Sequence, residues 1–523
     1  MCSSARVLVL LLLLGCGKPK EGWPTPTTDA RILEARRLLT EAGFPHGRGF
    51  PKLTLLYNTL ELHQKIAVAV QEMWRAGLGL PIELRNVDWN NLMTSRDRAD
   101  YDILRSGYSG EYSDPHSLLS LFLGDSTFNT AGWKSETYDK LVAESDLEPD
   151  PKKRLVTMGR AERVLLDELP MLPIYHYIGR HVVKPFVKNV HPNARDLHPL
   201  KAIRFEGAGV PADGTVIFNA GEEPQSLDPA ISHDMQGLVV LLNLFEGLVG
   251  YDPVTSQPVP AAAERWDISD DGRVYTFHLR EAKWSNGDPV TAGDFVYAWR
   301  RVVDPKTGSA YAHRMYDVEG GLEVAKGADL SKLAVRAIDD RTFEVTLRHR
   351  TPYFLQLACL NVFMPVHRTT VEAHKDWTTP DHMVCNGPYR LVERRLKDRK
   401  VFEKNAGYWD AANVKVKRAV FLTVVDSDAA FRMYEAGQVH WLYTIPTTYA
   451  EEIAKRTDTF AGPMNRAYFY LFNVKRKPLD DARVRRALSL CVDRESIVKH
   501  ILRSGEPAAY RLTPPLYPGY EVP

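Results

Sequence analysis

Hydrophobic and polar positions follow helical and strand periods in turn along the first hundred residues of this chain. Apolar residues recur at helical spacing from Ile32 to Ala42, and Gly43 follows as a helix-ending residue. The pattern then predicts a strand at 53–57, a helix at 63–76, a strand at 82–87 and a helix at 89–96. This alternation is typical of an open α/β sheet, whose ligands bind at the carboxyl ends of the strands.

A second clear pattern covers residues 263–290. Asp270-Asp271-Gly272 predicts a tight turn, residues 274–279 alternate as a strand, and Ser285-Asn286-Gly287-Asp288 predicts another turn. Thr291 is a candidate N-cap for a following helix. The apolar face of that helix holds Phe295, Val296, Ala298 and Trp299. On physical grounds alone this is a β-hairpin packed on a helix, and its side chains serve as scaffold.

Residues 101–115 combine a strand with a loop that holds spaced glycines, aromatic residues and both signs of charge. Proteins commonly present binding residues on such a loop, which the rigid scaffold positions. A solvated turn is the alternative, and composition leaves both open.

The N-terminus has the pattern of an export signal. Arg6 precedes the apolar run 7–14, which is too short to cross a bilayer, since a crossing helix needs about 20 residues. Leu13-Leu14-Gly15-Cys16 resembles the bacterial lipobox, in which Cys16 becomes the lipidated first residue. The alternative is a chance cysteine after a secretory signal.

Length and charge narrow the class of protein. A chain of 523 residues is too long for one core and predicts two or three domains. The formal net charge of +1 and the 25% charged content are those of an ordinary globular protein, with no basic excess to attract nucleic acid.

Catalytic motifs are absent from the sequence: it has no H-E-x-x-H, P-loop or G-x-S-x-G pattern. His176 and His181 are five positions apart with no metal-site pattern around them, so packed or solvated histidines are the favoured interpretation. We therefore expect no enzyme activity, no cofactor and no metal. Hydrolysis by Glu111 with a neighbouring carboxylate is the enzymatic alternative.

The 263–290 pattern resembles the motif of the large bacterial extracellular solute-binding proteins of family 5, specifically the oligopeptide-binding class. In that family the motif lies near the mature N-terminus, whereas about 260 residues precede it here. Residues 23–205 resemble the family's C-terminal part, and residues 208–523 resemble its N-terminal part. The Gly-, Ala- and Pro-rich segment 206–214 has the composition of a linker between them. We therefore expect a circular permutant, with a rearranged gene as the rival interpretation.

The resemblance implies an α/β, two-lobed fold like that of type II periplasmic binding proteins, with hinge crossings and an additional α/β domain. The expected parts are 1–22, signal peptide and tether; 23–178, second-lobe part with the amine-binding loop; 179–205, return to the first lobe; 206–245, first-lobe start; 246–365, extra domain; 366–466, first-lobe continuation; and 467–523, second-lobe start.

Ligand-binding positions also follow from the resemblance. Glu111 matches the acidic residue, usually Asp, that pairs with the α-ammonium of an extended peptide, and Tyr108 would line a side-chain pocket. The other matching positions are Ser109 in the same loop, the basic residues His63, Arg96 and Arg105, and the lining residues Trp89, Tyr175, Tyr177, His233, Met235, Tyr311 and Phe469. The family more often has an acidic residue at the position of His233, which weakens that match.

Three cysteines lie beyond the leader, which holds Cys2 and Cys16. An export signal implies an oxidising compartment. Cys359 ends an apolar, strand-like run, and the resemblance brings its segment near Cys385, so a disulfide between them is one alternative and two free thiols are the favoured one. Cys491 is expected to pack as a small buried hydrophobe.

The resemblance implies a monomeric, lipid-anchored receptor at the periplasmic or cell-surface side of a membrane. It would capture oligopeptides by lobe closure and deliver them to the membrane subunits of an ABC importer. One alternative is the same scaffold binding a murein peptide, an opine or a metal chelate. Another is a chaperone-like binder or a rearranged, inactive copy.

Overall fold

A computed structural model describes residues 26–523, so the leader with Cys2 and Cys16 lies outside the described residues. The chain forms two compact units. Unit 1 holds the described residues from 26 to Arg105 together with Glu168–Pro170 and Leu471–Asp493, and unit 2 holds the rest. The boundary at Arg105 falls inside the part expected to span 23–178. The finer division into seven parts stays a prediction.

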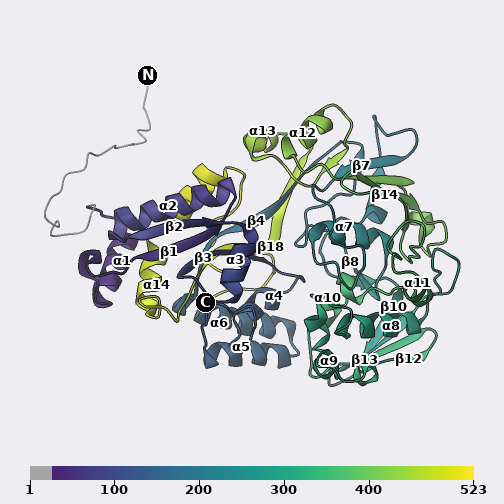
Figure 1. Cartoon of the computed structure of the whole chain (residues 1–523), viewed down its shortest axis with the longest axis horizontal. Helices are drawn as coiled ribbons and strands as arrows, with labels where there is room; N and C mark the ends of the chain where they lie inside the picture. The colour runs from purple at the N-terminus through teal and green to yellow at the C-terminus, as the bar shows by residue number, and fades with distance from the viewer. Residues whose placement is uncertain (1–25) are drawn as a thin grey trace. The chain divides into compact units, whose positions relative to one another are not determined.

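Unit 1 is built on parallel strands. β1 (Leu53–Asn58) pairs in parallel with β2 (Ile82–Val87) on one side and with the start of β3 (Ile103–Ser109) on the other. The helices are α1 (Ala30–Glu41), α2 (Glu61–Leu78), α3 (Trp89–Asp97) and α14 (Ala482–Leu490). α1 packs against α14 (Figure 1). The predicted helix and strand order is confirmed throughout this unit.

Segments far apart in sequence share the core of unit 1. The fully buried indole of Trp74 donates a hydrogen bond to the carbonyl oxygen of Leu488 at 2.9 Å. The Cys491 thiol is buried and donates to the carbonyl oxygen of Met73 at 3.1 Å, so its predicted packing as a small hydrophobe is confirmed.

The large sheet of unit 2 has the strand order β14-β15-β16-β7-β17-β4-β18. The bounds are β14 (Tyr389–Arg395), β15 (Arg399–Lys404), β16 (Arg418–Leu422), β7 (Thr215–Asn219), β17 (Trp441–Leu442), β4 (Met171–Val183) and β18 (Thr459–Phe472). β7 lies between two parallel neighbours, pairing Phe218 with Phe421 of β16 and with Trp441 of β17. Buried aromatic side chains fill the core beside these strands.

The predicted hairpin is confirmed as two strands of a smaller antiparallel sheet with the order β10-β11-β13-β12. The strands are β10 (Ala263–Ile268), β11 (Val274–Leu279), β13 (Thr342–Thr346) and β12 (Val335–Asp339). α8 (Ala292–Val303) packs on this sheet (Figure 1). Thr291 and Asp294 form a reciprocal capping box at its first turn, so the predicted N-cap is confirmed.

Further α-helices and four short strands complete unit 2. The helices are α4 (His116–Leu119), α5 (Glu136–Leu147), α6 (Pro151–Glu168), α7 (Met235–Leu244), α9 (Gly321–Ala325), α10 (Phe354–Leu357), α11 (Arg368–Ala373), α12 (Ser427–Glu435), α13 (Ala450–Ile453) and α15 (Arg494–Ile497). The remaining strands are β5 (Val187–Lys188), β6 (Arg204–Phe205), β8 (Val249–Tyr251) and β9 (Pro258–Pro260). Within residues 26–523, no helix has the length and apolar character needed to cross a membrane.

The structure contradicts the alternative of a disulfide between Cys359 and Cys385. Cys359 and Cys385 are both free and buried. The Cys359 thiol lies 3.3 Å from the carbonyl oxygen of Gly250, whereas the Cys385 thiol lies 3.2 Å from that of Tyr389. The run ending at Cys359 is also helical, as α10, and not a strand. Each thiol is therefore satisfied by a different backbone segment.

Candidate ligand-binding site

The loop that follows β3 is held rigidly by one buried asparagine. The backbone N–H of Gly110 donates to the carbonyl oxygen of Asn465 at 2.7 Å, and the Asn465 amide donates to Tyr112 O at 3.0 Å and Ser117 Oγ at 2.9 Å. A methyl group at Gly110 would lie 2.0 Å from Asn465 Nδ2, so the close approach requires glycine. The loop is therefore a fixed platform for its side chains.

Glu111, the residue expected to bind a ligand ammonium, already has two partners in the protein. The Tyr108 hydroxyl donates to Glu111 Oε1 at 2.8 Å, and the Arg314 guanidinium forms an ion pair with the same carboxylate. The Glu111 and Arg314 side chains are only 15% and 16% exposed. Burial raises the pKa of Tyr108 well above its ordinary value, and the Glu111 charge raises it further. A ligand ammonium would therefore share Glu111 with Arg314.

Aromatic side chains surround this pair. Tyr108 packs edge-on against Phe128 at 5.9 Å between ring centroids, Phe128 packs against His313, and His313 packs against Tyr311. Burial raises the pKa of Tyr311 to about 12, with Glu111 raising it and Arg314 lowering it. The structure thus brings Tyr108, Glu111 and Tyr311 together, while Ser109 is exposed. Sequence reasoning missed Arg314, because nothing near it in the chain indicates its partner.

The strand residues expected to face ligand lie among other aromatic rings. Tyr175 is 2% exposed and stacks on Tyr468 at 4.7 Å. The Arg466 guanidinium lies over the Tyr177 ring at 4.1 Å. Phe469 is buried against Phe122. Their predicted contact with ligand stays a prediction, since the packing shown is with the protein.

His233 and Met235 flank the start of α7. His233 is exposed, and its ring Nδ1 lies 3.2 Å from the carbonyl oxygen of Ile231. Met235 is 39% exposed. Asp234 between them caps α7 by accepting the Gly237 N–H at 2.6 Å, so the acidic residue in this loop has a structural role.

Four expected ligand contacts belong to unit 1. His63 is buried with its Nδ1 at 2.9 Å from Asn58 Oδ1, and Arg105 is buried in β3. Arg96 pairs with Asp97 at 2.8 Å, while Trp89 is 53% exposed. Their predicted roles toward a ligand stay predictions.

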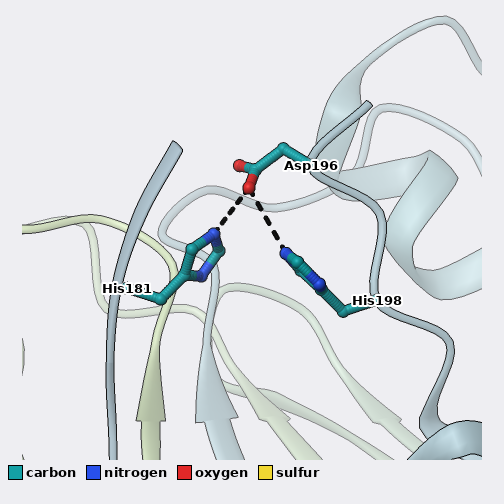
Figure 2. A group of neighbouring side chains, drawn as sticks. All are labelled: His181, Asp196 and His198. Carbon is teal, nitrogen blue, oxygen red and sulfur yellow. Dashed lines mark hydrogen bonds and ion pairs between the residues drawn. The ribbon is translucent and has the colours of Figure 1, made fainter. Parts of the chain in front are cut away.

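A buried group in unit 2, His181, Asp196 and His198, has the composition of a metal site. The two histidine rings approach the same carboxylate oxygen of Asp196 (Figure 2). His181 Nε2 lies 2.7 Å and His198 Nε2 lies 3.3 Å from Asp196 Oδ1. Burial raises the pKa of Asp196, but the two imidazoles outweigh burial and hold it well below its ordinary value. Burial lowers the pKa of His198 to about 4.

Hydrogen bonds on the far side of the rings argue against a metal there. The Trp441 indole donates to His181 Nδ1 at 3.1 Å, so His181 carries its proton on Nε2 and donates it to Asp196. A metal on Nε2 would place a proton on Nδ1, facing the indole N–H, whereas metal-binding histidines normally donate that proton to an acceptor. The group therefore fits a structural hydrogen-bond cluster.

A second histidine group, His374, Asp376 and His382, lies at the surface near the end of α11. His382 Nδ1 lies 3.1 Å from Asp376 Oδ1, and the two imidazole rings stack nearly parallel at 3.9 Å. Parallel rings direct their nitrogen lone pairs side by side and do not converge on one ion. This arrangement fits stacked rings beside a carboxylate and not a metal site.

Known proteins resemble this chain over most of its length. The family profile of the bacterial extracellular solute-binding proteins, family 5 (middle part), matches residues 17–130 and 257–523. The oligopeptide-binding protein OppA of Bacillus subtilis is 34% identical over 338 residues, 62% of this chain and 62% of that protein. The periplasmic murein peptide-binding protein MppA of Escherichia coli is 36% identical over 305 residues, 57% of this chain and 56% of its own length.

Solved structures of peptide-binding proteins also resemble this chain. The Escherichia coli murein tripeptide-binding protein MppA matches with a TM-score of 0.51 and 33% identity, over 58% of this chain and 60% of that one. A periplasmic oligopeptide-binding protein from Borrelia burgdorferi matches with a TM-score of 0.50 and 31% identity, over 56% and 59%. The predicted α/β fold of the type II binding proteins is confirmed. The matches nevertheless span less than two thirds of each relative's length.

Proposed function

Because this chain belongs to the bacterial extracellular solute-binding proteins of family 5, we propose that it is an extracytoplasmic receptor that binds oligopeptides and delivers them to an ABC importer. The observation that carries the proposal is the buried group of Tyr108, Glu111, Tyr311 and Arg314, in which Glu111 lies on the loop that Asn465 fixes. Aromatic walls with a few fixed charges are the usual lining of a ligand site.

We propose binding without turnover. Relatives named for oligopeptides and for murein peptides support peptides as the ligand class. A murein peptide is the second candidate, since a murein tripeptide-binding protein is among the structural relatives. Mass spectrometry of small molecules retained by the purified protein distinguishes the two. Intact peptides recovered after incubation support binding alone, and cleaved peptides would contradict it.

Glu111 supplies the sharper experiment. If a ligand ammonium pairs with it, Glu111→Gln removes one partner of a desolvated charge pair and weakens peptide binding by about 2 to 5 kcal/mol. N-acetylated peptides should then bind the unmodified protein poorly. Glu281→Gln, at an exposed position, is the matched control for loss of one negative charge. Equal affinity for free and acetylated peptides would show that Arg314 is the lasting partner of Glu111.

The location of the protein is also part of the proposal. We propose a monomer held at the membrane through a lipid on Cys16, which lies outside the described residues. Palmitate labelling that is lost in Cys16→Ala tests the anchor. Capture by closure of two lobes, which the family resemblance implies, stays a prediction that small-angle scattering with and without bound peptide checks.

A further inference from the structure

Within the part of the chain that the structure describes, Arg195 is a buried cation without an anionic partner. The residue is only 8% exposed, yet across residues 26–523 no carboxylate lies within ion-pair distance of its guanidinium. Its Nη1 also has no hydrogen-bond partner among the described residues. The guanidinium lies 5.6 Å from the ring centre of Tyr251, whose buried hydroxyl is likewise without a described partner. Burying an unpaired charge is costly, and a ring face offsets only part of that cost.

The backbone around Arg195 is held in place by Asn193. The Asn193 side-chain oxygen accepts the backbone N–H groups of Arg195 and Leu197, both at 3.1 Å. Its amide donates to the carbonyl oxygens of Leu197 at 2.8 Å and Pro253 at 3.2 Å. The guanidinium therefore extends from a segment whose conformation is already fixed, so little ordering is needed when an anion binds.

The same asparagine that fixes the Glu111 loop also contacts the Arg195 segment. The backbone N–H of Asn465 donates to the carbonyl oxygen of Ala194 at 2.7 Å, and its carbonyl oxygen accepts the Gly110 N–H at the same distance. Arg195 and Glu111 are thus each one residue away from a contact with Asn465. Tyr311 lies close enough to Arg195 and Glu111 for both charges to act on its hydroxyl. Burial has the largest effect and raises the pKa of Tyr311, Glu111 raises it further, and Arg195 lowers it.

We propose that Arg195 binds a carboxylate group of the ligand, at the site that also contains Glu111. A guanidinium presents a planar fork that accepts a carboxylate through two parallel hydrogen bonds. Arg314 already pairs with Glu111, whereas Arg195 has no carboxylate partner among the described residues and can attract an anionic group. The ligand class is a peptide with a free carboxylate, either at its C-terminus or on an acidic side chain. This inference rests on the proposed peptide-binding function.

The test compares unmodified protein with Arg195→Met and Arg195→Lys by calorimetric titration. Peptides are paired so that one member carries a C-terminal carboxylate and the other an amide, or one carries Glu and the other Gln. Arg195→Met should weaken binding of the carboxylate member by roughly tenfold to a hundredfold while sparing the neutral member. The pair that responds identifies the source of the carboxylate. Equal weakening of both members of every pair would overturn the proposal.

Stability without ligand provides an independent readout. Removing an unpaired buried charge should leave the thermal midpoint unchanged or raise it. Arg301→Met is the matched control, because Arg301 pairs with Asp228 at 2.8 Å and its loss strands a carboxylate. If Arg195→Met lowers the midpoint as much as Arg301→Met, Arg195 is structural and the proposal is wrong. Arg195→Lys keeps the charge and should retain part of the carboxylate preference.

A third arm does not depend on peptides. Succinate should raise the thermal midpoint of the unmodified protein and not that of Arg195→Met. If no peptide binds but succinate discriminates the two, the carboxylate site stands and the proposed peptide function fails. If peptides bind and neither succinate nor the paired peptides discriminate the variants, the function stands and the Arg195 site fails.

Discussion

Glu162 on α6 accepts the backbone N–H of Thr513 at 2.8 Å and also the hydroxyl of Tyr520, so a fully buried carboxylate fastens the last residues of the chain to this helix. Burial raises the pKa of Glu162, and its hydrogen bonds oppose that effect. The segment lies so close to α6 that a methyl group at Gly159 would be 1.9 Å from the carbonyl oxygen of Glu521.

Gly159→Ala should therefore destabilise the protein. Alanine favours a helix over glycine by about 1 kcal/mol, but overpacking costs about 1 to 3 kcal/mol. We expect a net loss in the free energy of unfolding, measured in urea. The control is the same substitution in a chain ending at residue 520. Without Glu521 the clash disappears, so there Gly159→Ala should stabilise; a loss of equal size in both chains would contradict this explanation.

His198 should make stability depend on pH between 4 and 6.5. Burial lowers its pKa to about 4 in the folded protein, below the ordinary value of 6.5. The unfolded chain therefore binds more protons in this interval, and stability falls as the pH falls. Linkage gives a loss of about 2 kcal/mol between pH 7 and pH 5 from this one residue.

His198→Gln should remove that part of the pH dependence, because glutamine can still donate to Asp196 but does not titrate. Urea unfolding at pH 7 and pH 5 measures it. His500→Gln, at an exposed position, is the control and should leave the difference between the two pH values unchanged. An undiminished difference in His198→Gln would mean that other histidines, such as the buried His176, carry the effect.

The Glu111 and Arg314 pair should behave as a unit in unfolding experiments. Glu111→Gln leaves a buried guanidinium without its partner, and breaking such a pair costs about 3 to 5 kcal/mol. Replacing both residues, as Glu111→Gln with Arg314→Met, should recover much of that loss. Purely additive losses in the double variant would show that the two charges do not interact.

Residues 23–205 and 208–523 should not fold separately. The Trp74 indole donates to Leu488, Trp441 donates to His181, and Glu162 accepts from Thr513, so each block supplies core contacts to the other. Each fragment alone would expose large apolar surfaces. We expect neither to show cooperative unfolding, and their mixture to recover it. A single fragment that unfolds cooperatively and binds peptide would contradict the prediction of one fold in permuted order.

Local signals predicted the elements well where one residue dictates the geometry. Gly43, with a φ of 94°, follows α1, and Thr291 caps α8 as its sequence indicates. The apolar run at 354–357 was wrongly predicted as strand-like, because a run this short has no period that distinguishes a buried helix from a strand. The site was harder to predict than the elements. Glu111 stood out in a loop of glycines, aromatic residues and charges, but its partner Arg314 lies 203 positions further along the chain. Pairing over that separation depends on the fold and leaves no local pattern.

The place of β7 has a consequence for how the protein is made. Both neighbours of β7 in the sheet, β16 and β17, follow it by about 200 residues or more. At typical rates of about 5 to 20 residues per second, the ribosome takes roughly 10 to 40 seconds to deliver the first of them. During that interval the strand Thr215–Asn219 has no sheet partner on either side. A strand without sheet partners can pair with another copy, and a holding chaperone or an unfolded passage through an export channel would prevent that pairing.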